Sequence, residues 1–327
     1  GFGRIGRYLV RLMAERNEFP VVINARADNA SLAHLFKYDS VHHTFKGTVG
    51  HDENGIIING THIAVTRCKP NEWQWKDYGV DLVVESTGTI KKRAGLAEHM
   101  ACGAKKVIMS APVSDADITI VMGVNDGLYD PAKHDVVSSA SCTTNCLAPV
   151  AKVLNDTFGI EQALMSTIHA ATAKQKAVDA RAGRDWRTGR SVLGNIIPSS
   201  TGAAKAIGKV VPSVNGKLQG HAQRVQVPDG SVTELTTVLN KEVTADEINA
   251  AFKAAFSSTD FYGYNEDGIV SSDIIGDTHG GVFDPTQTDV NTVDGVTMAR
   301  TVSWYDNEYG FTCNMVRTLL YFAEISE

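Results

Sequence analysis

Short apolar runs alternate with helical patterns over the first 140 residues. Runs of strand length occur at residues 21–25, 81–87, 105–112 and 135–141, and they are typical of strands buried on both faces. A helical pattern separates the second run from the third. Residues 56–65 are predicted to form a hairpin, because Asn59-Gly60 favours a two-residue turn. The alternation predicts an α/β fold with a doubly wound, mostly parallel sheet.

The second half of the chain combines long strands with helices. Residues 231–243 and 296–306 have the pattern of long strands. The segment after Cys142 is predicted to be helical, with an apolar stripe made of Leu147, Val150, Ala151 and Leu154. The last helix is predicted over residues 308–325, with a stripe of Phe311, Met315, Leu319 and Phe322.

A glycine-rich loop opens the chain. Gly1, Gly3 and Gly6 form a G-x-G-x-x-G motif that leads directly into a helical pattern. Glycines let the backbone approach a pyrophosphate, and the helix that follows directs its N–H groups and dipole at that anion. Such a motif normally follows a strand at the centre of the sheet. We therefore expect that a few N-terminal residues are missing from the sequence before Gly1.

The end of the strand at residues 21–25 bears on cofactor choice. An acidic residue there binds the ribose hydroxyls of NAD, whereas a basic residue accommodates the 2′-phosphate of NADP. Ala25 occupies this position and Arg26 follows it. Two interpretations stay open, since Arg26 is either a phosphate ligand or a surface charge paired with Asp28.

Composition narrows the class of protein. A chain of 327 residues with 43% apolar residues is long enough for two domains. The net charge of −6 argues against a nucleic-acid partner. No apolar run approaches the roughly 18 residues that span a bilayer, and no signal segment opens the sequence. Five cysteines, an odd and small number, favour a reducing compartment, so we expect a cytoplasmic protein without a membrane partner.

Cys142 and Cys146 lie four residues apart at the start of a predicted helix. This spacing suits neither a disulfide nor a zinc site, and no metal is expected. A cysteine at a helix N-terminus is favoured as a thiolate. We therefore predict that Cys142 is a nucleophile, whereas the other four cysteines, Cys146 among them, are small core residues.

A thiolate nucleophile needs a base, and one histidine of the ten stands out. His169 lies on a β-branched strand, where an imidazole is either structural or functional. His34 and His99 are interpreted as helix-face residues. Pairing of Cys142 with His169 would keep the thiol ionised near neutral pH.

Several motifs in order along the whole chain resemble phosphorylating glyceraldehyde-3-phosphate dehydrogenases. They are "GFGRIGR", "KYDSVH", "ESTG", "SASCTTNCLAP", "NIIPSSTGAAKA", "VNGKLQGHAQRV" and "WYDNEYG". The resemblance implies oxidation of glyceraldehyde 3-phosphate to 1,3-bisphosphoglycerate through a thioester on Cys142, with His169 as the base. Inorganic phosphate would cleave the thioester.

The same resemblance implies the remaining site residues. Those that would bind the two phosphates are Ser141, Thr143, Thr172, Thr201, Gly202 and Arg224. Those that would contact NAD or NADP are Gly1, Gly3, Arg4, Ile5, Gly6, Arg67, Ser110 and Asn307, the last through the nicotinamide carboxamide.

Two departures from the family pattern point to NADP. Members that prefer NAD usually carry Asn-Asp where Asn24-Ala25 stands, and Leu-Pro or Gly-Pro where Ala180-Arg181 stands. Loss of a carboxylate and gain of Arg26 and Arg181 lead us to expect that NADP is accepted. Lys174, in the same loop as Arg181, is a further departure without an explanation.

The resemblance also implies the architecture. The dinucleotide-binding Rossmann domain would span residues 1–141 plus 308–327, the α+β catalytic domain residues 142–307, and the assembly would be a homotetramer. Two alternatives stay open: an erythrose-4-phosphate dehydrogenase that releases free acid, and a non-catalytic nucleotide-binding scaffold.

Overall fold

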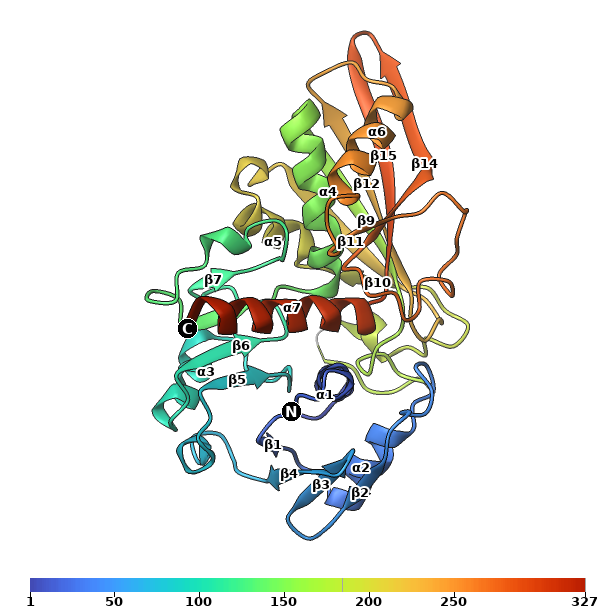
Figure 1. Cartoon of the computed structure of the whole chain (residues 1–327). Helices are drawn as coiled ribbons and strands as arrows, with labels where there is room; N and C mark the ends of the chain where they lie inside the picture. Colours follow the sequence, from blue (N-terminus) through green and yellow to red (C-terminus); the bar gives the residue numbers. More distant parts are fainter. Residues whose placement is uncertain (184, 327) are drawn as a thin grey trace. The chain divides into compact units, whose positions relative to one another are not determined.

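The computed structural model describes residues 1–183 and 185–326, and it divides into two compact units (Figure 1). The first unit comprises residues 1–120, 127–140 and 315–327, and the second comprises residues 121–126 and 141–314. Glu327, the last residue of the expected segment 308–327, lies outside the described residues. Within the described ranges, no helix combines the length and apolarity needed to cross a membrane.

The first unit contains two four-stranded sheets. One has the order β1-β4-β3-β2 and the other β5-β6-β8-β7. The strands of the first are β1 (Val22–Asn24), β2 (Val49–His51), β3 (Gly55–Ile58) and β4 (Thr61–Thr66). Those of the second are β5 (Leu82–Glu85), β6 (Lys106–Met109), β7 (Ile118–Thr119) and β8 (Val136–Ser138). The second sheet is wholly parallel, whereas the first is mixed, because β3 runs antiparallel to both of its neighbours.

The predicted hairpin is confirmed. Ile58 pairs with Thr61 across the turn, and Asn59 and Gly60 both have positive φ, 50° and 83°. Both φ values are those required by the turn that suits the twist of a hairpin.

The helices of the first unit are α1 (Arg4–Glu15), α2 (Asn29–Lys37), α3 (Arg93–Ala101) and the part of α7 (Tyr309–Ser326) from Met315 onward. The stripe predicted for the last helix is buried at Phe311, Met315 and Phe322, and Phe322 stacks on Tyr129 with ring centroids 3.8 Å apart. Short 3-10 turns are η1 (Trp75–Tyr78) and η2 (Asp126–Leu128).

A seven-stranded sheet forms the second unit, in the order β10-β11-β9-β12-β15-β14-β13. Its strands are β9 (Ile160–His169), β10 (Ile197–Ser200), β11 (Leu218–Arg224), β12 (Ser231–Leu239), β13 (Gly263–Tyr264), β14 (Val282–Val293) and β15 (Val296–Tyr305). Burial alternates along β12 residue by residue, so one face of the sheet is covered and the other is more open.

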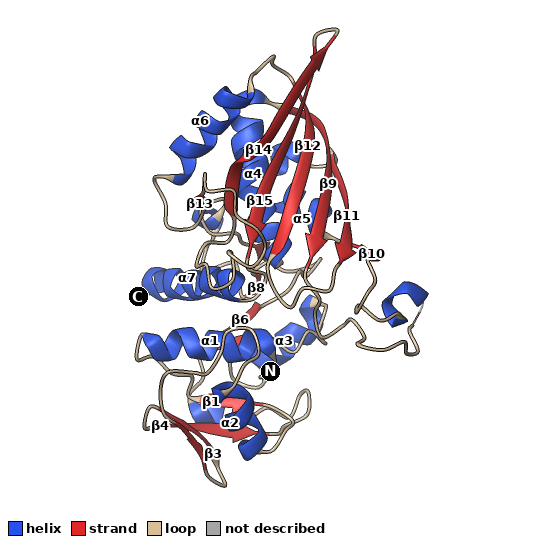
Figure 2. Cartoon of the chain, turned by 90° about the vertical axis from the view of Figure 1, so that its right-hand side faces the viewer, coloured by secondary structure: helices blue, strands red, loops and turns tan. Residues whose placement is uncertain are grey.

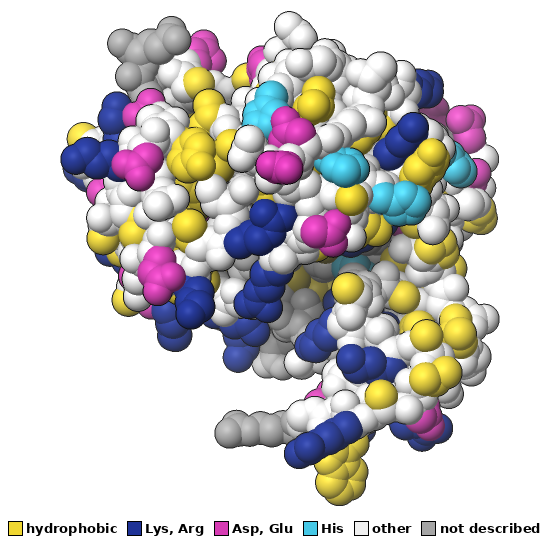
Figure 3. All heavy atoms as spheres, turned by 90° about the horizontal axis from the view of Figure 1, so that it is seen from below, with side chains coloured by type: hydrophobic (Ala, Val, Ile, Leu, Met, Phe, Trp, Pro, Cys, Tyr) yellow, Lys and Arg dark blue, Asp and Glu magenta, His cyan; other side chains and the backbone are white. Residues whose placement is uncertain are grey.

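Three helices cover one face of this sheet: α4 (Cys142–Phe158), α5 (Ala203–Val210) and α6 (Ala245–Phe256) (Figure 2). The stripe predicted for α4 is fully buried. Remaining turns are η3 (Trp186–Gly189) and η4 (Pro212–Val214). Over the face of the molecule that Figure 3 shows, acidic and basic side chains are interspersed with hydrophobic ones.

Candidate active site

The candidate nucleophile lies at the first position of a helix. α4 begins at Cys142, and the Ser141 hydroxyl caps it by accepting a hydrogen bond of 3.0 Å from the Thr144 N–H. Ala140 has a φ of 60°, in the left-handed region that a residue with a side chain rarely adopts. The strained backbone turns sharply just before Cys142, which leaves the thiol at the positive end of the helix dipole.

His169 comes to the thiol from the end of a strand. It is the last residue of β9, and its Nε2 lies 3.5 Å from the Cys142 Sγ. The neighbouring strand β11 places Arg224 directly beside His169 in register. Cys142, His169 and Arg224, which are far apart in the sequence, therefore converge on one site.

The expectation that the Cys142 thiol is ionised near neutral pH is not supported by this arrangement. Burial raises the pKa of Cys142, although the positive charge of Arg224 acts in the opposite direction. Burial, together with Arg224, also lowers the pKa of His169 to about 3. Burial of both side chains therefore favours the neutral thiol and the neutral imidazole over their charged forms.

Two partners compete for the Nδ1 atom of His169. The Ala170 carbonyl oxygen lies 2.9 Å away and requires a proton on Nδ1. The Arg224 guanidinium, 2.5 Å away, can only donate and requires a lone pair there. The first partner leaves Nε2 as an acceptor for the thiol proton, whereas the second leaves Nε2 protonated. The position of Arg224 thus determines which nitrogen of His169 is the base.

The residues expected to bind phosphates are only partly brought together. Arg224 contacts His169, and the buried Thr143 hydroxyl lies 4.0 Å from the Cys142 sulfur. The Thr201 hydroxyl accepts from the Ala203 N–H at 3.1 Å, at the start of α5. Among the described residues, no hydrogen bond joins Thr172, Thr201 or Gly202 to the cysteine–histidine pair. A Cβ at Gly202 would meet open space, so the start of α5 is accessible to an anion.

Two supporting residues were not singled out from the sequence. The Tyr305 hydroxyl lies 2.9 Å from that of Thr143 and 2.8 Å from that of Thr167, and its ring meets His169 edge-on. Burial raises the pKa of Tyr305, so its hydroxyl stays protonated. Tyr305 lies within the quoted motif "WYDNEYG", but only the register of β15 against β12 shows what it holds.

Ser231 is the second supporting residue. Its hydroxyl donates to the Asn307 amide oxygen at 2.6 Å and accepts from the Ala170 N–H at 3.0 Å. These contacts fix which way the amide of Asn307 faces, because its oxygen must point to Ser231. The amide nitrogen donates to no described residue and is available to a ligand.

The first unit contains a cavity of about 860 Å³ that includes the glycine-rich loop. A Cβ on Gly1 would lie 2.8 Å from the Thr87 nitrogen, and one on Gly6 would lie 2.3 Å from the Gly1 oxygen. Above Gly3, by contrast, a Cβ would meet nothing within 4 Å, and no side chain caps α1. The glycine-rich loop is therefore tightly packed at Gly1 and Gly6 and open at Gly3, next to the N-terminus of α1, as a dinucleotide pyrophosphate requires.

Other expected cofactor residues of this unit have partners of their own. The Arg4 side chain forms an ion pair with Asp39. Arg67 donates to the Ala27 carbonyl and the Asn29 side chain, both at 2.7 Å for its closest nitrogen. The Ser110 N–H donates to the Glu85 carbonyl at 3.0 Å. Ile5 is half-buried in the first turn of α1.

Arg26 is exposed at the cavity wall, beside the buried Ala25. Asp28 does not pair with it: its carboxylate caps α2, accepting from the Ser31 N–H at 2.8 Å and from the Ser31 hydroxyl at 2.7 Å. These hydrogen bonds lower the pKa of Asp28. Arg26 itself forms no hydrogen bond or ion pair with any described residue, so its guanidinium is available. Arg181 is exposed in the second unit.

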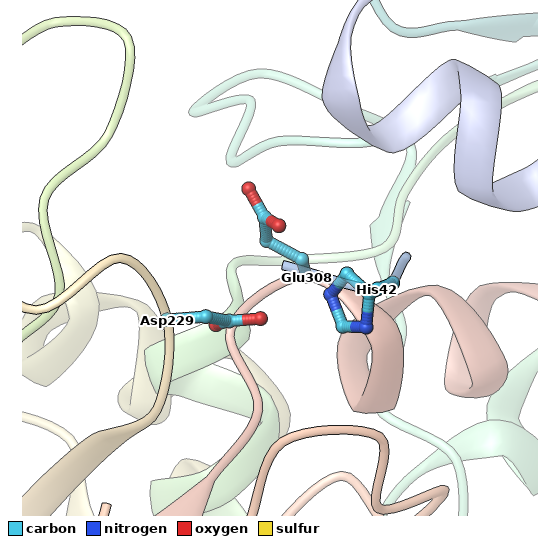
Figure 4. A group of neighbouring side chains, drawn as sticks. All are labelled: His42, Asp229 and Glu308. Atoms are coloured by element: carbon cyan, nitrogen blue, oxygen red, sulfur yellow. The ribbon is translucent and has the colours of Figure 1, made fainter. Parts of the chain in front are cut away.

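Figure 4 draws the side chains of Asp229 and Glu308, which are both buried in the second unit, together with His42 of the first.

A glycine-rich dinucleotide loop in one unit and a cysteine–histidine pair in the other define the class: a dinucleotide-dependent dehydrogenase that acts through a cysteine. Comparison with known proteins identifies the family. The model of the glyceraldehyde 3-phosphate dehydrogenase NAD binding domain matches residues 1–93, and that of the C-terminal domain of the same enzyme matches residues 141–307.

Curated relatives agree over the full chain. Glyceraldehyde-3-phosphate dehydrogenase of Clostridium pasteurianum is 49% identical over 331 residues, covering 100% of this chain and 98% of the relative. That of Streptococcus pyogenes serotype M1 is 50% identical with the same coverage. The chain belongs to the glyceraldehyde-3-phosphate dehydrogenase family and is an oxidoreductase with an NAD-binding domain.

Proposed function

We propose that the chain oxidises glyceraldehyde 3-phosphate to 1,3-bisphosphoglycerate, with inorganic phosphate as second substrate and a thioester on Cys142 as the intermediate. The observation that carries this proposal is the 3.5 Å approach of the Cys142 Sγ to the His169 Nε2 at a helix N-terminus. Membership of the glyceraldehyde-3-phosphate dehydrogenase family supports this choice of substrate.

The residues act in two half-reactions. The Cys142 sulfur adds to the aldehyde carbon as its proton passes to His169 Nε2, and His169 then gives this proton to the former carbonyl oxygen, which becomes the hydroxyl of a hemithioacetal. The Cys142 N–H, at the start of α4, stabilises charge on that oxygen. NAD bound at the glycine loop supplies the hydride acceptor. His169 accepts the hydroxyl proton as the adduct becomes a thioester.

The second half-reaction regenerates the thiol. A phosphate oxygen attacks the thioester carbon, the carbon–sulfur bond breaks, and His169 returns a proton to the sulfur. Arg224 is the charged group that binds an anion beside this pair, because its guanidinium already lies against His169. A thioester can transfer its acyl group to phosphate, whereas a carboxylate formed by water could not.

A spectrophotometric assay tests the proposal. The chain is supplied with glyceraldehyde 3-phosphate and dinucleotide, with and without phosphate. We expect turnover that depends on phosphate and is abolished by Cys142→Ala. Oxidation of erythrose 4-phosphate without need of phosphate would favour the acid-releasing alternative, and binding of dinucleotide without turnover would favour the scaffold.

Residues of the first unit support acceptance of NADP as well as NAD. Ala25 removes the carboxylate that would repel a 2′-phosphate, Arg26 is exposed and unpaired at the cavity wall, and Asp28 is occupied in capping α2. Arg181 of the second unit is a further arginine that the proposal assigns to this phosphate. Values of kcat/KM for both cofactors test it in the parent chain, in Ala25→Asp and in Arg26→Ala. A tenfold or greater preference of the parent for NAD would contradict it.

We further infer that the chain forms a homotetramer in the cytoplasm. The loop between β9 and β10 exposes large apolar side chains, with 84% of Trp186, 73% of Val178 and 66% of Ile196 accessible. Such a group of exposed apolar residues is typical of a surface covered by a partner. All five cysteines are free, in keeping with a reducing compartment. Light scattering after size-exclusion chromatography measures the assembly; a monomer would contradict it.

A further inference from the structure

A buried polar cluster in the first unit takes no part in the chemistry described above. Glu85 ends β5, His99 lies on α3, and Trp75 begins η1; their exposed fractions are 3%, 1% and 6%. His99 lies on a helix, as predicted, and the structure shows that its side chain is buried. A carboxylate and an imidazole with so little exposure need specific partners.

Hydrogen bonds fix the protonation pattern of the cluster. The indole N–H of Trp75 can only donate, so Nδ1 of His99, 3.0 Å away, accepts. The proton of His99 therefore lies on Nε2, which donates to Glu85 Oε2 at 3.2 Å. The Trp73 ring stacks on the imidazole, with centroids 3.8 Å apart, and holds its plane. The three groups form a one-directional relay from Trp75 through His99 to Glu85.

Glu85 connects this relay to the glycine-rich loop. Its other oxygen accepts from the Thr87 N–H at 2.7 Å, and the Ser86 hydroxyl donates to the Gly1 carbonyl at 3.0 Å. The loop is in direct contact with this turn, because a Cβ on Gly1 would lie 2.8 Å from the Thr87 nitrogen. A shift of the turn at residues 85–87 would therefore displace the backbone of the glycine-rich loop at Gly1. Burial by itself would raise the pKa of Glu85, but hydrogen bonds from His99 and Thr87 lower it to about 2.

We infer that Glu85, His99 and Trp75 are positioning residues for dinucleotide binding. They hold the turn at residues 85–87 against the glycine loop, so that the loop is preformed for the pyrophosphate before the cofactor arrives. The inference rests on dinucleotide binding at this loop, and it assigns the three residues to cofactor affinity and not to the chemical step at Cys142.

Glu85→Gln tests the relay. The oxygen of the introduced amide would accept from Thr87, which leaves the amide NH2 group facing the Nε2–H of His99. His99 would relieve this clash only by moving its proton to Nδ1, where it would then face the indole N–H of Trp75. We expect the dissociation constant for NAD, measured by isothermal titration calorimetry, to rise about tenfold, equivalent to roughly 1.4 kcal/mol. The kcat at saturating cofactor should be nearly unchanged.

A double variant separates positioning from simple destabilisation. Trp75→Phe removes the opposing indole N–H, so His99 can reverse its proton without a clash. The loss of NAD affinity caused by E85Q should therefore be several-fold smaller in the W75F background than in the parent. Equal effects in the two backgrounds, or a fall in kcat with unchanged affinity, would overturn the inference.

A matched control keeps the test decisive if E85Q does not fold. Trp73→Phe removes indole area from the same cluster but no hydrogen bond of the relay. We expect W75F to weaken NAD binding at least threefold more than W73F, and equal effects would overturn the inference. The rate of Cys142 alkylation reports whether the second unit is intact. Failure of the parent chain to bind NAD would refute the proposed function instead.

Discussion

Replacement of Ser231 by Ala gives the sharpest test of how the active site is built. Ser231 has 1% of its surface exposed, and its hydroxyl satisfies two buried groups, the Asn307 amide oxygen and the Ala170 N–H. Alanine leaves both without a partner. An unpaired buried group costs ~1–3 kcal/mol, so with two such groups we expect the free energy of unfolding to fall by about 2–6 kcal/mol.

Ser303 supplies a matched control on the neighbouring strand β15. It is 2% exposed, and its hydroxyl has no hydrogen-bond partner among the described residues. Ser303→Ala should therefore be neutral or slightly stabilising, within about 1 kcal/mol. Urea unfolding, followed by circular dichroism, compares the two variants at equal change in side-chain volume.

The activities of the two variants should differ in the same direction as their stabilities. Without the Ser231 hydroxyl, the Asn307 amide can rotate and present its oxygen where the parent presents nitrogen. We expect kcat/KM for NAD to fall several-fold in S231A and to be unchanged in S303A. Equal losses of stability in the two variants would refute the hydrogen-bond reasoning, and equal activities would refute the role of Asn307.

Five further outcomes follow from the structure. Cys142→Ala should abolish turnover in the spectrophotometric assay, and His169→Asn should slow it by ~10²–10⁴-fold through loss of the base. Because burial raises the pKa of Cys142, its alkylation by iodoacetamide in anion-free buffer should accelerate as the pH rises above neutrality; a rate that levels off below pH 7 would contradict this. Sulfate should change that rate in the parent but not in Arg224→Gln, as measured by mass spectrometry. The pKa of Glu85 is lowered to about 2, so its ionised carboxylate stabilises the fold fully at pH values above the ordinary pKa of 4.5. This contribution should be lost as the pH falls toward about 2. The acid-unfolding curve of E85Q should lack this loss.

Local chemistry explains which features of the fold were predictable from the sequence. The hairpin turn at Asn59-Gly60 depends on backbone preferences of two adjacent residues, and the start of α4 depends on a serine cap at Ser141. Both are encoded within a few residues. The position of Cys142 at the start of α4 could be predicted for the same reason, since it is a local property of the sequence.

Contacts between distant strands were not predictable in this way. His99 has the pattern of a helix-face residue, and only the packing of the segment carrying Trp73 and Trp75 buries it. Ser231 lies 76 positions before Asn307, and no spacing rule relates the two. The antiparallel placement of β3 between β2 and β4 likewise depends on pairing that short apolar runs leave undetermined.

The charge state of the cysteine–histidine pair shows why position alone does not define a nucleophile. A helix N-terminus favours a thiolate, yet desolvation dominates at Cys142, and its pKa is raised. His169 can remove the proton only if Nδ1 is protonated toward Ala170, a state that Arg224 opposes from 2.5 Å. An anion that draws Arg224 away would remove this opposition and the positive charge that lowers the pKa of His169. If the proposed function holds, an anion bound at Arg224 would therefore turn His169 into a base for the thiol, and this is the effect that the sulfate experiment measures.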